Sequence, residues 1–388
     1  MSRELARRGN NVTHVFFSDF QTPRGSVALK DYDPATLDIV SLTLGVPFAK
    51  SAFLKRRRQE IEYGRKLAEL ILKLRPDTVI SSNAPLDSQW EIMKACRQIK
   101  GCRFIFWLQD FYGEAIYRIL GAKLGILGRL VGSYYIDRER RMLLESDHVI
   151  SICEDFVPLL LGKGLQKDSI TVAENWAPLD EIAPRPKENE WSIANGFAAT
   201  RNIVYSGTLG YKHNPNLLMR LAAETDANVL VFSEGKVADE LARDARRRGI
   251  SSLSVRPWVD YRDLPNVLGS ADILVALIEP DAGIFSVPSK VLTYSCIGRP
   301  ILASIPESNL AARIILREQS GLIAAPTDGD IFIANARQLL ANDRMRYDMG
   351  RNGRAYAERE FGIAALGNDF EDIILKSRLT RSPPRFAN

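Results

Sequence analysis

The clearest structural signal in this chain is the stretch at residues 277–304, LIEPDAGIFSVPSKVLTYSCIGRPILAS. It opens at the end of the apolar run 271–278, which predicts a buried strand of a parallel sheet, because such strands are apolar on both faces. A polar loop follows, then a short helix expected at about 289–296 and a second apolar strand at 301–304. Strand, polar loop and helix start together can bind phosphate, because backbone N–H groups and the positive end of the helix dipole face the anion.

Two polar residues at this helix start strengthen the hypothesis of an anion site. Ser289 is a residue type that favours the N-cap position. Lys290 lies in the first turn, where a cation gains nothing from the helix dipole. An anionic ligand explains its charge better. The alternative, a buried strand–loop–helix unit that binds nothing, stays open.

Length and composition favour a two-domain globular protein in a reducing compartment. A chain of 388 residues exceeds one ordinary hydrophobic core, and a hydrophobic content of 46% is typical of globular proteins. The net charge of +5 suits an anionic ligand or an anionic membrane surface without requiring either. The 4 cysteines show neither zinc spacing nor a disulfide pattern, and no apolar run reaches about 18 residues. We expect a cytoplasmic protein with no spanning helix and no signal peptide.

Strands and helices alternate along the chain, which predicts two doubly wound α/β units with parallel sheets. We expect a first domain at 1–185, a linker at about 180–200, a second domain at 200–362 and a C-terminal helix at 363–380. Long helices are expected at 53–74 and at 114–145, the second one broken near Gly121 and Gly125. The expected strands are 11–17, 37–44, 78–82, 103–108, 148–153 and 170–173, then 202–205, 228–232, 253–255, 271–278, 301–304 and 321–324.

The opening stretch resembles the donor-sugar loop of GT-B glycosyltransferases, specifically the retaining family-four, or group 1, type. The matching residues are Pro288–Leu292, Tyr294 and Gly298–Leu302, and the resemblance extends from about Asn11 to Phe361. It implies two facing Rossmann-like domains, of which the N-terminal one binds the acceptor and the C-terminal one binds a nucleotide-sugar. It also implies that the C-terminal helix crosses back to the first domain.

The chain departs from this family at two places. Two glutamates usually frame the donor loop, and here Phe285 and Thr293 take their positions, as in subgroups that build bacterial surface polysaccharides. The family's first strand and its Gly-rich acceptor loop are also absent before the helix expected at 2–8. Such an absence predicts two unpaired strand edges in the first domain. Either Met1 is an internal methionine of a longer chain, which we favour, or this copy is damaged.

Ligands of such sheets bind outside the carboxyl ends of the strands, and the resemblance places the donor there in the second domain. Gly207 and Gly210 let the backbone approach a diphosphate, and Lys212 and Lys290 are expected to carry the charge of the leaving diphosphate. Trp258 and Val259 are expected to hold the base, or else Trp258 packs in the interdomain seam. The full set of expected donor-binding residues is Gly207, Thr208, Gly210, His213, Ser233, Glu234, Gly235, Trp258, Val259, Phe285, Ser286, Val287, Pro288, Ser289 and Thr293.

On the acceptor side, Asp110 ends an expected strand and is the candidate to accept the proton of the acceptor hydroxyl. The alternative is that Asp110 caps the next helix. Asn83 and Glu154, each just past a strand, are further candidates to line this side. The 3 histidines do not cluster with carboxylates, and GT-B enzymes work without a bound metal, so we expect neither metal nor cofactor. The implied reaction is sugar transfer with retention, through an oxocarbenium-like transition state and without an enzyme nucleophile.

The basic cluster Lys55–Arg58 opens the long helix at 53–74. It is either a solvated face or a contact with an anionic membrane, where a polyprenyl-diphosphate-linked acceptor would lie. The expected partners are a UDP-sugar donor, a lipid-linked or saccharide acceptor and the inner face of the cell membrane, with no nucleic acid.

Three functions compete on this sequence. The first is a glycosyltransferase of surface polysaccharide synthesis. The second is another GT-B enzyme, such as a nucleotide-sugar 2-epimerase, which would need more His, Glu and Asp in the cleft. The third is a non-catalytic nucleotide-sugar-binding homologue, which the missing strand, Phe285 and Thr293 favour. The sequence names neither the sugar nor the acceptor.

Overall fold

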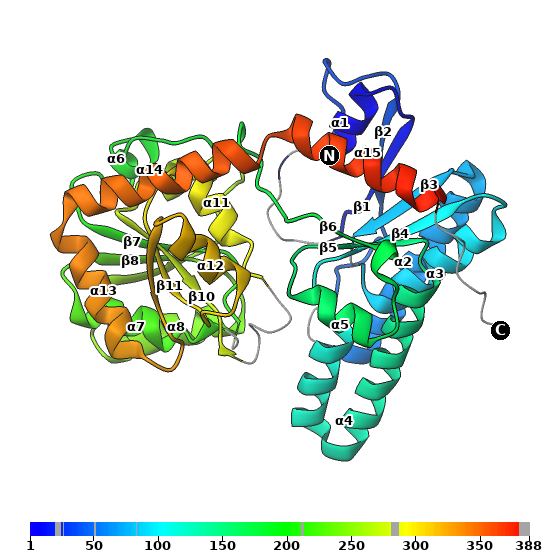
Figure 1. Cartoon of the computed structure of the whole chain (residues 1–388). Coiled ribbons are helices and arrows are strands. Elements are labelled where there is room, and N and C mark those ends of the chain that lie inside the picture. The colour runs from blue at the N-terminus through cyan, green and yellow to red at the C-terminus, as the bar shows by residue number, and fades with distance from the viewer. Residues whose placement is uncertain are drawn as a thin grey trace. The chain divides into compact units, whose positions relative to one another are not determined.

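The computed structural model describes residues 1–19, 25, 27–49, 52–82, 84–210, 213–280 and 287–379. The chain divides into two compact units (Figure 1). The first holds the chain up to Glu174, apart from Gly25, together with the C-terminal helix from Ile363. The second holds Gly25 and the chain from Asn175 to Gly362. Every strand pair among these described residues is parallel, as the alternation of strands and helices predicts.

The strands of the first unit form two separate sheets. In one, β1 (Val12–Phe17) pairs with β2 (Leu37–Leu42). In the other, the order is β3 (Thr78–Ser82), β4 (Arg103–Leu108), β5 (His148–Ser151) and β6 (Ile170–Val172). The sequence predicts two unpaired strand edges in this domain. In the described part of the chain, β1 has a neighbouring strand on one side only, which is β2, and β3 has one on one side only, which is β4.

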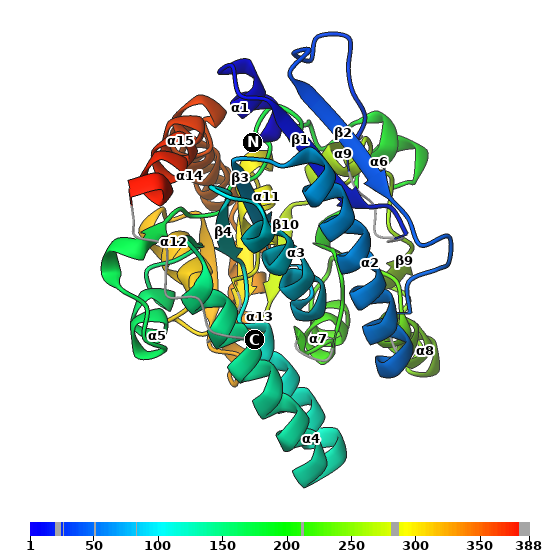
Figure 2. The same cartoon turned by 90° about the vertical axis from the view of Figure 1, so that its right-hand side faces the viewer.

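The helices of the first unit flank these sheets. α2 and α3 pack against each other, and the long α4 folds back on itself (Figure 2). Its backbone is non-helical at Gly125 only, with φ 58° and ψ −130°, so the second break expected at Gly121 is not found. The helices are α1 (Ser2–Arg7), α2 (Phe53–Leu74), α3 (Leu86–Gln98), α4 (Tyr112–Glu145), α5 (Phe156–Gly162), the 3₁₀ turn η1 (Lys167–Ser169) and α15 (Ile363–Leu379).

The C-terminal helix α15 packs on the first unit. The ring of Phe370 meets that of Trp107 in β4 at 5.0 Å, edge to face. Glu371 forms an ion pair of 2.8 Å with Arg8, next to the end of α1. The aromatic contact therefore attaches α15 to β4, and the ion pair attaches it to the end of α1.

The second unit has one six-stranded sheet. The strand order is β12 (Gly321–Ala324), β11 (Ile301–Ser304), β10 (Ile273–Leu277), β7 (Asn202–Ser206), β8 (Asn228–Phe232) and β9 (Leu253–Arg256). Figure 1 shows α7 (Asn216–Glu224), α8 (Lys236–Arg247) and α13 (Gly329–Ala341) on one face and α11 (Lys290–Ile297) on the other. Further helices among the described residues are α6 (Glu190–Ala194), α9 (Leu264–Gly269), α12 (Leu310–Arg317) and α14 (Asp343–Glu360). The apolar run 273–277 is buried throughout, which explains why it forms a central strand.

The segment expected as a linker, 180–200, contains a helix instead. Asn189 caps α6 by accepting from the backbone N–H of Ser192, and the Ser192 hydroxyl in turn accepts from the backbone N–H of Asn189. This reciprocal capping box stabilises a short helix in a segment whose prolines and charges suggested irregular structure. The unit division also assigns the chain to the second unit from Asn175 onward.

Candidate functional site

The sheet of the second unit reverses its strand order between β7 and β10. From β7 the chain proceeds to β8 and β9 on one side, and from β10 it proceeds to β11 and β12 on the other. In open parallel sheets, ligands bind outside the carboxyl ends of the strands at such a reversal. The loops that leave β7 and β10 therefore form the candidate site.

The turn after β7 requires a glycine. Gly207 has φ 122°, a conformation that residues with a side chain rarely adopt, and its N–H donates to the carbonyl of Phe232 at 3.1 Å. Beside it, the Tyr205 hydroxyl donates to the carbonyl of Thr208 at 2.8 Å. These bonds fix a short loop whose backbone turns sharply at the end of a buried strand.

The start of α11 lies against this turn. The Lys290 Nζ is 3.6 Å from the centroid of the Tyr205 ring, which places an ammonium over an aromatic face. A Cβ added to Gly207 would lie 3.7 Å from the same Nζ. The structure thus brings together the two residues, far apart in sequence, that we expected to meet a diphosphate.

The helix start itself can receive an anion. Ser289 occupies the N-cap position of α11, and its own side chain makes no capping hydrogen bond. Within the first turn, the N–H groups of Val291 and Leu292 donate to the carbonyls of Pro288 and Ser289 at 3.2 and 3.1 Å. What the helix start offers an anion is the positive end of the helix dipole together with Lys290. Val287 and Pro288, just before it, are half-buried, and Thr293 is half-buried one turn into the helix.

The loops after β8 and β9 are tied to the same edge of the sheet. The backbone N–H of Leu209 donates to the Ser233 hydroxyl at 2.9 Å, which joins the loops after β7 and β8. The backbone N–H of Trp258 donates to Glu234 Oε1 at 3.2 Å, which joins the loops after β8 and β9. Gly235, with φ 106°, starts α8 directly after them, and Trp258 and Val259 are both half-buried.

His213 is held by its own turn. The backbone N–H of Gly210 donates to its Nδ1 at 2.9 Å, and the ring is buried. This contact makes His213 a structural part of the loop after β7. The expected site residues Lys212, Phe285 and Ser286, and the acceptor-side candidate Asn83, lie outside the described residues.

In the first unit, Asp110 follows β4 and is half-buried. α4 begins after it with Phe111 at the N-cap and has no side-chain capping bond. The helix-capping alternative for Asp110 stays a prediction. Glu154, the other expected residue of this unit, follows β5 and is exposed.

A carboxylate that the sequence did not single out lies beside the start of α4. Glu139, in the second arm of α4, is fully buried and accepts from the backbone N–H of Gly113 at 3.3 Å. Burial raises its pKa to about 7, because the charged form is poorly solvated there. In the sequence it lies in the charged run 137–141, so no local pattern distinguishes it from its exposed neighbours.

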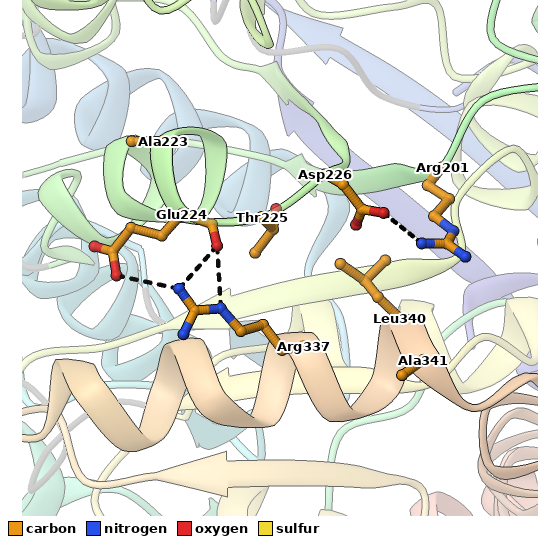
Figure 3. Close-up of a pocket in the computed structure, with 8 residues that line it drawn as sticks. All are labelled: Arg201, Ala223, Glu224, Thr225, Asp226, Arg337, Leu340 and Ala341. Atoms are coloured by element: carbon orange, nitrogen blue, oxygen red, sulfur yellow. Dashed lines mark hydrogen bonds and ion pairs between the residues drawn. The ribbon is translucent and has the colours of Figure 1, made fainter.

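A pocket of the second unit lies at the opposite edge of its sheet (Figure 3). Arg201 directly precedes β7, and Asp226 lies just before β8. The charged side chains that line this pocket are paired. Arg201 Nη1 lies 2.5 Å from Asp226 Oδ2, and Arg337 donates to the carbonyl of Glu224. It lies at the amino ends of the strands, where such sheets do not bind ligands, and we do not assign it to the donor. Over the described ranges, no three His, Cys, Asp or Glu side chains converge to hold a metal ion.

Protein-family models match both parts of the chain. The glycosyl transferase 4-like domain matches residues 1–176, and the glycosyl transferases group 1 domain matches residues 200–342. No curated protein matches the chain in sequence.

Solved structures of similar fold cover most of the chain. Sucrose-phosphate synthase from Thermosynechococcus elongatus is 14% identical, with a TM-score of 0.71 over 97% of this chain and 91% of its own. The Anabaena protein HepE, solved with UDP and glucose, is 12% identical, with a TM-score of 0.65 over 88% and 89%. An E. coli trehalose-6-phosphate protein, solved with UDP-2-fluoro glucose, is 13% identical, with a TM-score of 0.67 over 95% and 94%. These low identities show a shared fold, and the two domain models add the family. The chain is a glycosyltransferase of GT-B fold, built from a glycosyl transferase 4-like domain and a glycosyl transferases group 1 domain.

Proposed function

We propose that this enzyme transfers a sugar with retention from a UDP-sugar to a lipid-linked or saccharide acceptor, in the synthesis of a surface polysaccharide. The observation that carries the proposal is the position of Lys290. Its Nζ lies over Tyr205 and beside Gly207, at the reversal of strand order and at a helix start without a side-chain cap. The binding of UDP and glucose by HepE, a protein of similar fold, supports UDP as the nucleotide.

The donor's diphosphate fits the start of α11. The positive end of the helix dipole there and the Lys290 ammonium supply positive charge without any metal. Lys212 is the second lysine assigned to the diphosphate. The loops joined by Glu234 and Trp258 are assigned to the nucleoside, with Ser233 and Gly235 beside them and Val259 as a further contact.

The reaction breaks the bond between the sugar's anomeric carbon and the diphosphate, whose charge these groups stabilise as it leaves. The acceptor oxygen forms the new bond on the same face of the sugar. Asp110 takes the proton of the acceptor hydroxyl, and the leaving diphosphate is the alternative proton acceptor. Peripheral membrane contact through Lys55–Arg58 would bring the enzyme to a polyprenyl-diphosphate-linked acceptor.

The test is UDP binding by calorimetry together with sugar transfer from UDP-glucose. Lys290→Met keeps the apolar stem over Tyr205 but removes the charge. We expect it to weaken UDP binding by about 10–100-fold, the value of a charge-assisted hydrogen bond. Arg247→Ala, at the exposed far end of α8, is the matched control. Unchanged UDP affinity in Lys290→Met would remove this loop from the donor site. UDP binding without transfer to any acceptor would instead favour the epimerase or the non-catalytic alternative.

A further inference from the structure

The helix α4 is a hairpin that projects from the first unit. Its two arms meet at the non-helical Gly125 and run antiparallel, as Figures 1 and 2 both show. The base of the hairpin is tied to its neighbours through the buried Asp87. The Tyr135 hydroxyl donates to Asp87 at 2.7 Å, and Arg57 of α2 reaches the same carboxylate at 3.2 Å. The hairpin therefore has a fixed base and a projecting tip.

Glycines, and not apolar side chains, hold the two arms together. A Cβ added to Gly128 would lie 1.9 Å from the carbonyl oxygen of Leu120, and one added to Gly132 would lie 2.4 Å from the Cα of Tyr117. The arms thus touch backbone to backbone. Gly128 and Gly132 have the G-x-x-x-G spacing by which helices pack closely where water supplies no hydrophobic driving force.

Leu120 of the first arm is buried, but many apolar side chains near the turn of the hairpin are exposed. Ile126, Leu127, Leu130, Val131 and Tyr134 share one face of the second arm, because their spacing is helical. Together with Ile119 and Leu124 of the first arm they are between 39% and 78% exposed. We call this set of seven side chains the hairpin patch. The five side chains of the second arm form one exposed apolar face, and an exposed apolar surface of this kind marks an interaction site.

Within residues 115–136, which carry the hairpin patch, the charges are all of one sign. Residues 115–136 include Arg118, Lys123 and Arg129 and no aspartate or glutamate. At the hairpin's base, α2 opens with the exposed Phe53 and Leu54, followed by the basic cluster Lys55–Arg58. A partner for this surface must therefore offer an apolar layer covered by negative charge. A second copy of the hairpin would instead bring like charges together.

We propose that the tip of the α4 hairpin inserts its hairpin patch into the interfacial layer of an anionic membrane. At ~1.5 Å per residue the patch extends about 9 Å from the turn at Gly125 along the first arm and about 14 Å along the second. The part nearest the turn therefore fits the ~5–10 Å depth of interfacial helices. Lysine and arginine at the tip reach back to the phosphates through their long stems. Among the described helices, none combines the length and the apolarity needed to cross a bilayer. The inference deepens the membrane contact in the proposed function, but it does not depend on sugar transfer.

Vesicle flotation of the full chain tests the inference. We expect the protein to float with vesicles of phosphatidylcholine and phosphatidylglycerol, and not with phosphatidylcholine alone. The double variant Ile126→Ser/Leu127→Ser should lower the bound fraction at least about tenfold, because two large apolar side chains no longer leave water. The matched control is Leu159→Ser/Leu161→Ser, which alters two exposed leucines of α5 in the same unit. Equal flotation of wild type and hairpin variant would overturn the proposal.

A fluorescent label distinguishes insertion from surface attraction. The 4 native cysteines are buried, so Leu127→Cys can be labelled selectively with an environment-sensitive dye. We expect its emission to shift to the blue with anionic vesicles, and that of a label at Leu159→Cys to stay unchanged. Flotation without this shift would overturn insertion. The proposal would also be overturned if the wild type formed dimers and bound no vesicles, and if the double serine variant abolished those dimers. The hairpin patch would then bind a second copy of the chain.

Two further measurements keep the test independent of folding and of the donor site. Melting of both serine variants should match the wild type, because the altered side chains are exposed. UDP affinity, measured on the same samples, should also be unchanged. Loss of vesicle binding with UDP binding intact supports the hairpin. If the protein binds vesicles but does not bind UDP, the donor assignment is contradicted and membrane insertion by the hairpin is still supported.

Discussion

Tyr294 of α11 and Ser206 at the end of β7 hold each other through two hydrogen bonds. The backbone N–H of Ser206 donates to the Tyr294 hydroxyl at 3.2 Å, and that hydroxyl donates to the Ser206 carbonyl at 3.3 Å. The buried Tyr294 side chain thus joins α11, which follows β10, to the end of β7. The strand order reverses between these two strands. The position of Lys290 relative to Gly207 depends on this connection, because Lys290 lies one turn before Tyr294 on the same helix.

Tyr294→Phe should therefore weaken both the fold and the donor site. It leaves two backbone groups of Ser206 without their partner, which destabilises the second unit by about 1–3 kcal/mol. UDP binding should weaken as well, because the start of α11 is no longer fixed against the turn. Denaturant unfolding and calorimetry measure the two effects. Tyr347→Phe, an exposed tyrosine of α14, is the control and should change neither.

Gly207→Ala should reduce UDP affinity about tenfold, or ~1.4 kcal/mol. The added Cβ lies in the space beside the Lys290 Nζ, and φ 122° strains any residue with a side chain. The comparison variant is Gly196→Ala, where φ is 76° but nothing lies within 4 Å of the added Cβ. Both should lose stability through strain, and only the first should lose UDP affinity. Equal UDP affinity in the two variants would show that ligand does not approach Gly207.

The sequence predicts several strands of both units well. The strands expected at 78–82, 103–108, 228–232, 301–304 and 321–324 are found with those bounds, because each is a short apolar run that ends at polar or turn residues. The proximity of Lys290 to Gly207 also follows from the sequence, since loops after neighbouring parallel strands share one edge. Both features depend on local pattern and on topology alone.

Three other features depend on packing that no local pattern contains. The Tyr294–Ser206 bonds require the final placement of a helix against a strand. The helix α6 depends on the reciprocal bonds of Asn189 and Ser192, in a segment whose composition predicts a linker. The outward face of the α4 hairpin follows from the close approach of Gly128 to Leu120, which exists only when the arms pair. The sequence alone predicts a long broken helix there.

Asp110→Asn tests the assigned base. Asparagine keeps the shape and loses the basicity, so transfer should fall by about 10²–10⁴, the usual effect of losing a general base. UDP affinity should stay the same, because Asp110 belongs to the first unit. The measurement is the initial rate of UDP release at saturating UDP-sugar, with a saccharide or polyprenyl-diphosphate acceptor. Asp168→Asn, an exposed aspartate of the same unit, is the control. A wild-type rate in Asp110→Asn would assign the proton to the leaving diphosphate.

Glu139 should make the stability of the first unit depend on pH. Its pKa is about 7 in the folded protein and about 4.5 as its ordinary value, so the folded state binds more protons between these two values. The free energy of unfolding should therefore fall as pH rises from about 4.5 through 7, by at most ~3 kcal/mol for this group. Above that range the burial of a charged carboxylate continues to destabilise the fold.

Glu139→Gln removes this titration and keeps an oxygen that accepts from the Gly113 N–H. Since glutamine carries no charge at any pH, the variant should be more stable than the wild type at pH 8 and nearly equal to it at pH 4.5. The measurement is denaturant unfolding of both proteins at the two pH values, with the difference between them as the result. Taking that difference removes the contribution of every other titrating group. Glu188→Gln, at an exposed position of the second unit, should give the same difference from wild type at both pH values. The opposite result is a stability difference between Glu139→Gln and the wild type that is the same at both pH values. That result would show that the Glu139 carboxyl has the same pKa in the folded and the unfolded protein.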